Sequence, residues 1–198
     1  MTSVIGRRTW IGLSVFALIA IGLGWAATAW RSAAPVSAPL IGGPFALTTH
    51  DGKRLTDKDL LGQPFALFFG FTHCPDICPT SLLELSAVID KLGSSAEKMR
   101  FLFVTIDPER DTPDQLKLYL SSFNPRIIGL TGSVDEIKAA AKAYRAYWQR
   151  VPTSDSYTMN HSTFTYLMDR HGKYTSLIAY QQPVDAQVAA MKRVIAAP

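Results

Sequence analysis

The chain has 198 residues, and 47% of them are hydrophobic, which is enough for one domain with a real core plus an extension. Its formal net charge is +4, but Arg7, Arg8 and Arg31 belong to the N-terminal extension, so residues 32–198 carry 17 basic residues against 16 acidic ones. No basic stripe is left to follow a phosphate backbone, and this argues against a nucleic-acid-binding protein.

The first predicted element is a membrane anchor. Trp10 to Trp30 is a stretch of 21 residues without a charge, long enough to cross a hydrocarbon layer of roughly 30 Å. Arg7 and Arg8 precede it, so we expect residues 1–31 to form a cytoplasmic N-terminus and a single-pass helix, with the rest of the chain outside. The small residues 27–29 also suit a signal peptidase, so a cleaved signal peptide stays an alternative.

A linker and a hairpin come next. Residues 32–44 lack periodicity and contain several prolines, which is typical of a linker, and residues 45–198 form the predicted folded domain. An Asp-Gly turn joins short extended pieces at 45–48 and 53–55, which predicts a β-hairpin. We expect His50, beside that turn, to be a solvated loop residue.

Alternating strands and helices follow the hairpin. The apolar run 64–71 predicts a central strand buried on both faces, followed by a helix to about Leu92. A second buried strand is expected at 101–106, and then a helix from Pro113 through Ser122 with Thr112 as its N-cap.

The last third of the chain predicts a short strand at 127–130 and a helix over 134–148 that Ser133 caps. We expect the aromatic residues of this helix to lie in the core; they are Tyr144, Tyr147 and Trp148. A polar, exposed loop is predicted at 152–158. Strands at 164–168 and 174–179, joined by a turn at a solvated His171, and a helix over 184–196 complete the chain.

This order predicts an α/β fold. Its first part alternates strands with helices, which favours a parallel core, and the late hairpin adds antiparallel strands at the edge. A thioredoxin-like fold satisfies the order, with the functional loop after the first core strand. Both cysteines of the chain, Cys74 and Cys78, fall in that loop and the first turn of the helix behind it.

Two thiols at this spacing can bond each other or share a metal. In an oxidising compartment the pair forms a disulfide unless a reductant or a metal intervenes. His161, between the polar loop and a predicted strand, is the candidate third donor. Two sulfurs and one imidazole suit copper, because soft ligands select Cu(I), whereas structural zinc normally takes four ligands; zinc with a water stays open.

Four stretches in this order resemble the Sco/SenC family of membrane-anchored copper proteins: Gly70 to Pro79, Asp107 to Pro113, Gly129 to Gly132, and Asn160-His161-Ser162. The resemblance covers nearly all of residues 40–196. It implies a thioredoxin-like domain that faces the periplasm, or the mitochondrial intermembrane space, and binds Cu(I) or Cu(II) through Cys74, Cys78 and His161.

The function that the resemblance implies is cytochrome c oxidase assembly. Such a copper metallochaperone delivers copper to the dinuclear copper site of the oxidase's second subunit, or reduces the cysteines of that site. The resemblance implies other copper chaperones and a thiol reductant as further partners. Asp107 matches an acidic residue of the family, which implies a supporting or docking role. Asn160 stands where family members often have Asp, so it cannot add charge near the metal. Asp76 is interpreted as a helix N-terminal carboxylate.

Three other interpretations compete with a copper chaperone. The first is an enzyme, a thiol-disulfide oxidoreductase in which Cys74 attacks and Cys78 resolves the mixed disulfide. Three residues rather than the usual two separate the cysteines, and an exchange between two thiols would not require His161. Both points argue against this interpretation. A structural disulfide would close too short a loop to stabilise the fold much. A peroxidase fits the fold, but the two-thiol stretch does not resemble a peroxidatic site.

Overall fold

The computed structural model describes Trp25 and residues 41–197. The anchor predicted for Trp10 to Trp30 and most of the predicted linker therefore lie outside the described residues. Within the part of the chain that is described, no helix has both the length and the apolar character needed to cross a membrane. The folded unit is described from Ile41 onward.

A mixed β-sheet organises the domain. In the described residues seven strands form it, in the order β2 (Arg54–Thr56), β1 (Ala46–Thr49), β5 (Ile127–Thr131), β4 (Arg100–Thr105), β3 (Phe65–Gly70), β8 (Thr165–Met168) and β9 (Tyr174–Ile178). The central strands β3, β4 and β5 are parallel, and the other pairs are antiparallel. The predicted parallel core with antiparallel edges is confirmed.

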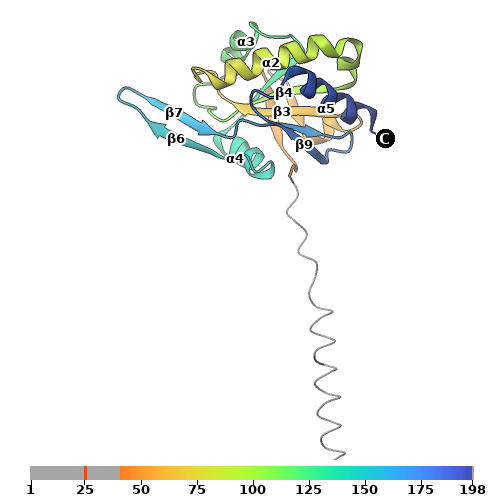
Figure 1. Ribbon diagram of the computed structural model, residues 1–198. Coiled ribbons are helices and arrows are strands. Elements are labelled where there is room, and N and C mark those ends of the chain that lie inside the picture. The colour runs from red at the N-terminus through yellow and green to blue at the C-terminus, as the bar shows by residue number, and fades with distance from the viewer. Residues whose placement is uncertain (1–24, 26–40, 198) are drawn as a thin grey trace, which may run out of the picture. The chain divides into compact units, whose positions relative to one another are not determined.

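Helices cover both faces of this sheet, as Figure 1 shows: α2, α3 and α5 lie over one face and α4 lies on the other. Their bounds are α2 (Ile77–Leu92), α3 (Pro113–Leu120), α4 (Val134–Ala143) and α5 (Val184–Ala196), with short 3-10 turns η1 (Asp57–Leu60) and η2 (Gly93–Lys98). The hydroxyl of Thr112 accepts the N–H of Gln115, and that of Ser133 accepts the N–H of Glu136, so both predicted N-caps are confirmed.

The core is densest around β3, whose six residues are all buried. Successive side chains of a strand point to opposite faces, so β3 packs on both layers. Phe69 contacts the rings of Tyr144 and Tyr166, whereas Phe68 contacts Phe103 on β4. Burial of each large apolar side chain of β3 contributes about 1.5–3 kcal/mol to the free energy of unfolding, relative to leaving it exposed. The end of β3 is therefore a rigid platform for the loop that carries the first cysteine.

The helix predicted over 134–148 is too long. It ends at Ala143, and Arg145 takes a left-handed conformation with φ 54° that stops the helix. Trp148 begins a strand instead. Of the predicted aromatic stripe, Tyr144 is buried, Trp148 is half-buried, and Tyr147 is 58% exposed.

The polar, exposed loop predicted at 152–158 is confirmed for residues 153–156, but it is shorter than expected, because Pro152, Tyr157 and Thr158 belong to the strands of a hairpin. Strands β6 (Trp148–Pro152) and β7 (Tyr157–His161) pair antiparallel with each other and form a separate two-stranded sheet. Polar residues suit such a ribbon, since one of its faces meets water. Figure 1 shows this β6–β7 hairpin projecting from the end of the domain.

The prediction of a solvated His50 is wrong as well. Its Nδ1 accepts the backbone N–H of Gly129 at 2.9 Å, and its side chain is 18% exposed. The reason is tertiary: β1 pairs with β5, which brings the turn after β1 against β5. His171 is exposed at its turn, as expected.

Candidate metal centre

The two cysteines lie between the end of β3 and the first turn of α2. After Gly70 the chain turns, with the N–H of Cys74 donating to the carbonyl of Phe71 at 3.3 Å, and Cys78 is the second residue of α2. The N–H of Cys78 donates to Sγ of Cys74 at 3.4 Å. The first N–H groups of a helix have no partner within it, so this sulfur takes the place of an N-cap side chain. Both cysteines are free thiols.

The two thiols differ in exposure and in acidity. Cys78 is fully buried and Cys74 is half-buried. The hydrogen bond from Cys78 outweighs partial burial and, with the backbone N–H groups of Cys78 and Asp76, lowers the pKa of Cys74 to about 4. The hydrogen bond with Cys74, burial and the charge on Cys74 raise the pKa of Cys78. The pair therefore holds one proton, with Cys74 as the thiolate.

The third donor comes from the hairpin. His161 ends β7, and its Nε2 lies 3.5 Å from Sγ of Cys78. Its Nδ1 lies 2.8 Å from the carbonyl oxygen of Ser162, which can only accept, so we assign the proton to Nδ1. The edge contacts with Phe68 and Phe71, at centroid distances of 6.1 and 5.8 Å, fix the ring plane. Nε2 is left with a free lone pair aimed at the thiols.

The three ligand atoms of Cys74, Cys78 and His161 all lie within 4.8 Å of one another. Metal bonds of about 2.0–2.3 Å to sulfur and nitrogen place three trigonal ligands roughly 3.8 Å apart. The three donor atoms are thus slightly farther apart than in such a trigonal site, and metal binding needs only a small contraction of the set. A neutral imidazole whose other nitrogen donates to a carbonyl is the usual state of a metal-binding histidine. The donors fit a metal ion.

Gly70 makes room for the buried thiol. A Cβ at this position would lie 2.9 Å from Sγ of Cys78 and 2.7 Å from the ring of Phe103. The ring of Tyr119, on α3, packs against Phe103, and its buried hydroxyl has no hydrogen-bond partner in the described part of the chain. Burial, together with the negative charges of Cys74 and Asp111, raises the pKa of Tyr119, so it stays a neutral phenol.

The hairpin is held to the domain by a cluster that we name the Tyr157 clamp, formed by Asp107, Arg110, Arg150 and Tyr157. The Tyr157 hydroxyl donates to buried Asp107 at 2.8 Å, and Arg110 donates both to Asp107 and to the carbonyl of Tyr157. The two guanidinium groups lie 3.7 and 3.9 Å from the Tyr157 ring centroid. Arg150 also pairs with Glu109. Asp107 is thus a support of the hairpin that carries His161.

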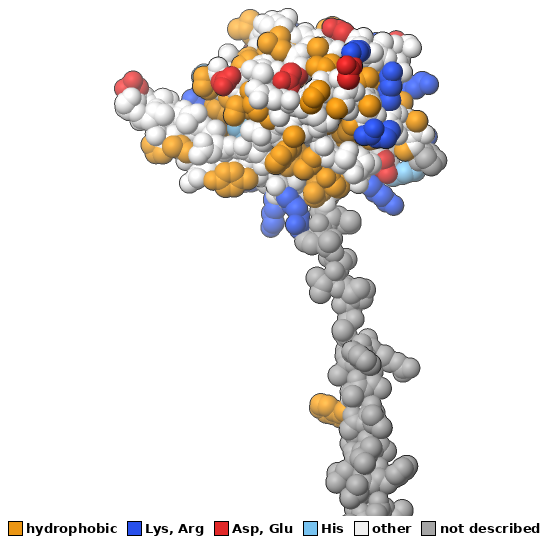
Figure 2. All heavy atoms as spheres, in the orientation of Figure 1, with side chains coloured by type: hydrophobic (Ala, Val, Ile, Leu, Met, Phe, Trp, Pro, Cys, Tyr) orange, Lys and Arg blue, Asp and Glu red, His pale blue; other side chains and the backbone are white. Residues whose placement is uncertain are grey.

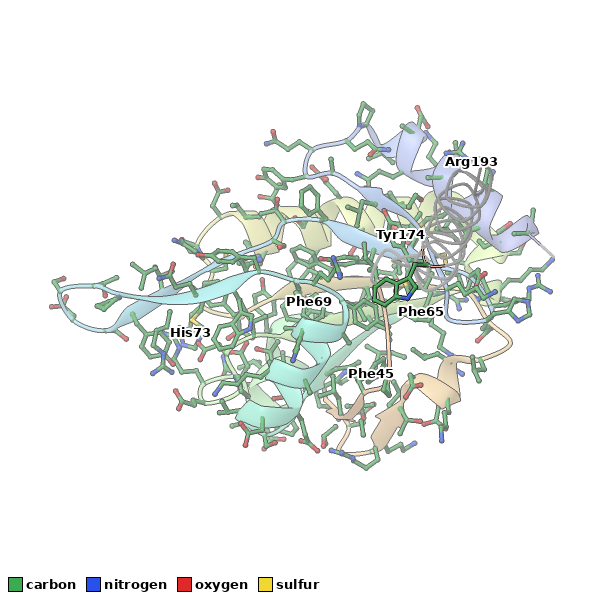
Figure 3. The ribbon with its side chains drawn as sticks, turned by 90° about the horizontal axis from the view of Figure 1, so that it is seen from below. Phe45, Phe65, Phe69, His73, Tyr174 and Arg193 are labelled. Carbon is green, nitrogen blue, oxygen red and sulfur yellow. The ribbon has the colours of Figure 1, made fainter. Side chains whose placement is uncertain are left out.

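A second buried carboxylate holds the loop before Cys74. Asp111 accepts the N–H of Thr72 at 3.0 Å, its hydroxyl at 2.6 Å, and the hydroxyl of Thr105 at 2.6 Å. Nδ1 of His73 lies 3.8 Å from the same carboxylate. Figure 3 shows His73 toward the end of the domain from which the hairpin projects, with Arg193 toward the other end. Sequence reasoning missed Asp111, because nothing local marks Thr72 and Thr105 as its partners.

The remaining predicted residues lie at the rim. Asn160 is exposed and pairs through its backbone with Gln149. Neighbouring residues on a strand alternate between its faces, so Asn160 and His161 project from opposite faces of β7, and Asn160 also lies at the edge of the cavity beside Cys74. Asp76 is the N-cap residue of α2, as expected for a helix N-terminal carboxylate, but its side chain makes no cap hydrogen bond.

An open cavity of about 370 Å³ gives access to Cys74, with Phe71, Cys74, Ile77, Tyr147, Met159 and His161 among its lining residues. Its walls are mostly apolar. Figure 2 shows hydrophobic side chains gathered near the base of the hairpin, and acidic and basic side chains of both signs elsewhere on that face. The cavity admits a soft ion or a small apolar surface of a partner.

Known proteins share this sequence and this fold. A family model described as SCO1/SenC matches residues 33–196. The chain is 45% identical to Protein SCO1 homolog 1, mitochondrial, of Arabidopsis thaliana, over 74% of this chain and 44% of that protein. It is 43% identical to the Homo sapiens Protein SCO1 homolog, mitochondrial, over 70% and 48% respectively. The chain spans about half the length of these curated relatives.

Solved structures cover the folded domain. Bradyrhizobium japonicum ScoI with copper bound is 48% identical, with a TM-score of 0.74 over 78% of this chain and 99% of that one. Arabidopsis thaliana ScoI with copper bound is 42% identical, with a TM-score of 0.74 over 78% and 98%. They confirm the predicted thioredoxin-like α/β fold. The model match and these identities together show that the chain belongs to the SCO1/SenC family.

Proposed function

We propose that this protein is a copper metallochaperone that holds copper through Cys74, Cys78 and His161. The observation that carries the proposal is the arrangement of three donors within 4.8 Å, with the free Nε2 of His161 facing the thiols. A site with two sulfurs and one nitrogen is soft and three-coordinate, which suits Cu(I). ScoI structures from Bradyrhizobium japonicum and Arabidopsis thaliana contain copper, which supports the choice of metal.

The copper is cargo, and the site suits its release. The cavity opens beside Cys74, so a partner's ligands can reach the metal from the exposed side while Cys78 stays behind it. We propose that the acceptor is the dinuclear copper site of cytochrome c oxidase subunit II. Other copper chaperones would load the site, and a thiol reductant would keep the two cysteines reduced beforehand.

The proposed setting is the outer side of an inner membrane. Residues 1–31 would form the cytoplasmic N-terminus and a single-pass anchor, 32–44 a linker, and 45–198 the copper-binding domain in the periplasm or the intermembrane space. The charge pattern around the 21-residue apolar stretch supports this topology. The mitochondrial relatives support a membrane-associated setting of this type.

A second candidate function is reduction of the acceptor's own cysteines. The specific observation is the half-exposed Cys74 thiolate at the start of α2, backed by the buried Cys78 thiol. Sγ of Cys74 would attack a partner disulfide, form a mixed disulfide and release one partner thiolate. Cys78 would lose its proton and attack Cys74, which releases the second partner thiolate and leaves a Cys74–Cys78 disulfide.

One experiment separates the two functions. The purified, reduced protein is titrated with Cu(I) anaerobically, alongside Cys74→Ser, Cys78→Ser and His161→Ala, and each variant is also assayed for reduction of a peptide disulfide. One copper per wild-type chain, lost in all three variants, supports the chaperone. Copper binding that survives all three changes, with reductase activity lost in either cysteine variant, overturns it in favour of the reductase.

A further inference from the structure

Met159 lines the cavity that Cys74 and His161 also line, and it has no role so far. It is on β7, two residues before His161, and residues at this spacing share one face of a strand. Their Cα atoms are roughly 7 Å apart, so a long side chain at 159 reaches the region of the His161 ring. Met159 is buried, and it lines the same cavity as Cys74 and His161.

The chemistry of the thioether suits this place. Sulfur of methionine is a soft ligand that selects Cu(I), and a long, weak methionine bond completes several copper sites that have strong histidine and cysteine ligands. Two thiols and one imidazole leave a fourth position open. Methionine is unbranched and has three rotatable bonds, so its sulfur can approach a metal without movement of the backbone.

From this placement we propose that Met159 is a weak fourth ligand for the bound copper, an inference that rests on the proposed copper-binding function. Its thioether would meet the ion on the side of the β6–β7 hairpin. The neutral sulfur adds no charge, so it would favour Cu(I) over Cu(II) and would slow loss of the ion to solvent.

The competing role for Met159 is packing. Met159 also lines a neighbouring cavity beneath the hairpin, together with Ile106, Asp107 and Trp148. Leucine has a similar volume and is equally apolar, so Met159→Leu keeps the packing and removes only the sulfur. Met191 provides a matched control because it is fully buried in α5 and does not line the cavity beside the thiols.

The first measurement is Cu(I) affinity of the reduced full chain, in competition with a chromophoric Cu(I) chelator. We expect Met159→Leu to weaken binding about tenfold, at unchanged thermal stability, and Met191→Leu to bind as wild type does. Equal Cu(I) affinity of Met159→Leu and wild type overturns the proposal. No copper binding by wild type would instead overturn the proposed function, so the two failures are distinct.

The second measurement observes the bond directly. The protein is prepared with selenomethionine and loaded with Cu(I), and X-ray absorption is recorded at the selenium edge. We expect a copper scatterer at bonding distance from selenium in the wild type and in Met191→Leu, and its disappearance in Met159→Leu. Absence of a copper scatterer in copper-loaded wild type assigns Met159 to packing alone and contradicts the proposal.

Discussion

The thiol half and the histidine half of the metal centre are built differently. The thiols lie directly after β3, a central strand that pairs with β4 on one side and β8 on the other and is buried throughout. His161 comes from the β6–β7 hairpin, whose strands, among the described residues, pair with each other and with no other strand. The Tyr157 clamp ties this hairpin to the rest of the domain through Asp107 and Arg110, and the N–H of Ser162, which donates to the carbonyl of Tyr147, closes the base of the hairpin.

This difference separates binding from stability. The positions of Cys74 and Cys78 depend on the main core, so a change beneath them alters both folding and metal binding. The position of His161 depends on a few polar and ring contacts of a peripheral ribbon. Changes in the hairpin should therefore alter metal affinity while the domain stays folded.

The largest expected effect comes from removing the histidine ligand. His161→Ala should weaken Cu(I) binding more than about 100-fold, because one of three strong donors is lost, with little change in thermal stability. Asn160→Asp is the matched control on the same strand, and we expect it to bind within about threefold of wild type, since Asn160 is exposed and is not one of the three donors. Chelator competition measures both. Equal copper retention by wild type and His161→Ala would contradict the assignment of His161 as a copper ligand.

Alkylation compares the reactivity of Cys74 with that of Cys78, the two cysteines of the thiol half. The pKa of Cys74 is lowered to about 4, so Cys74 remains a thiolate at pH 6. Its reaction with iodoacetamide should stay nearly constant from pH 8 to 6, whereas an ordinary thiol slows by roughly 100-fold as protons return to it. Mass spectrometry should find the label on Cys74 and not on buried Cys78. Labelling that falls with pH like that of free cysteine contradicts this.

Gly70→Ala tests the core beneath the thiols. The new Cβ meets Sγ of Cys78 and the Phe103 ring at distances that force both to shift. We expect a loss of about 1–3 kcal/mol in the free energy of unfolding, together with weaker Cu(I) binding. Denaturant unfolding and chelator competition measure the two effects. A variant that loses neither shows that the thiol half is less tightly packed than the structure indicates.

The smallest effect is expected in the clamp. Tyr157→Phe keeps the ring between the two guanidinium groups but removes the hydrogen bond to Asp107. We expect a loss of about 1 kcal/mol in hairpin anchoring and a Cu(I) affinity lower by about fivefold, through His161 rather than through global unfolding. Tyr147→Phe, which loses a bond to exposed Gln149, is the control. Equal Cu(I) affinities of Tyr157→Phe and Tyr147→Phe would show that the Tyr157 clamp does not affect copper binding.

Local sequence signals were sufficient for most of the fold. The apolar run of β3, the Asp-Gly turn after β1 and the caps Thr112 and Ser133 each act over a few residues, so they can be read from the chain. The segment from Tyr144 to Thr158 could not be read this way. Its helical pattern yields to pairing between Trp148 and His161, residues that meet only once the hairpin forms.

The sequence by itself determined the two thiols and their place behind a buried strand, and it offered His161 as the candidate third donor. Only the tertiary structure decided how His161 is oriented, which thiol is buried, and which carboxylates support the site. The physical reason is distance along the chain: Asp107 meets Tyr157 and Asp111 meets Thr72 across 50 and 39 residues. Such contacts depend on sheet order and hairpin docking, and no local pattern encodes them.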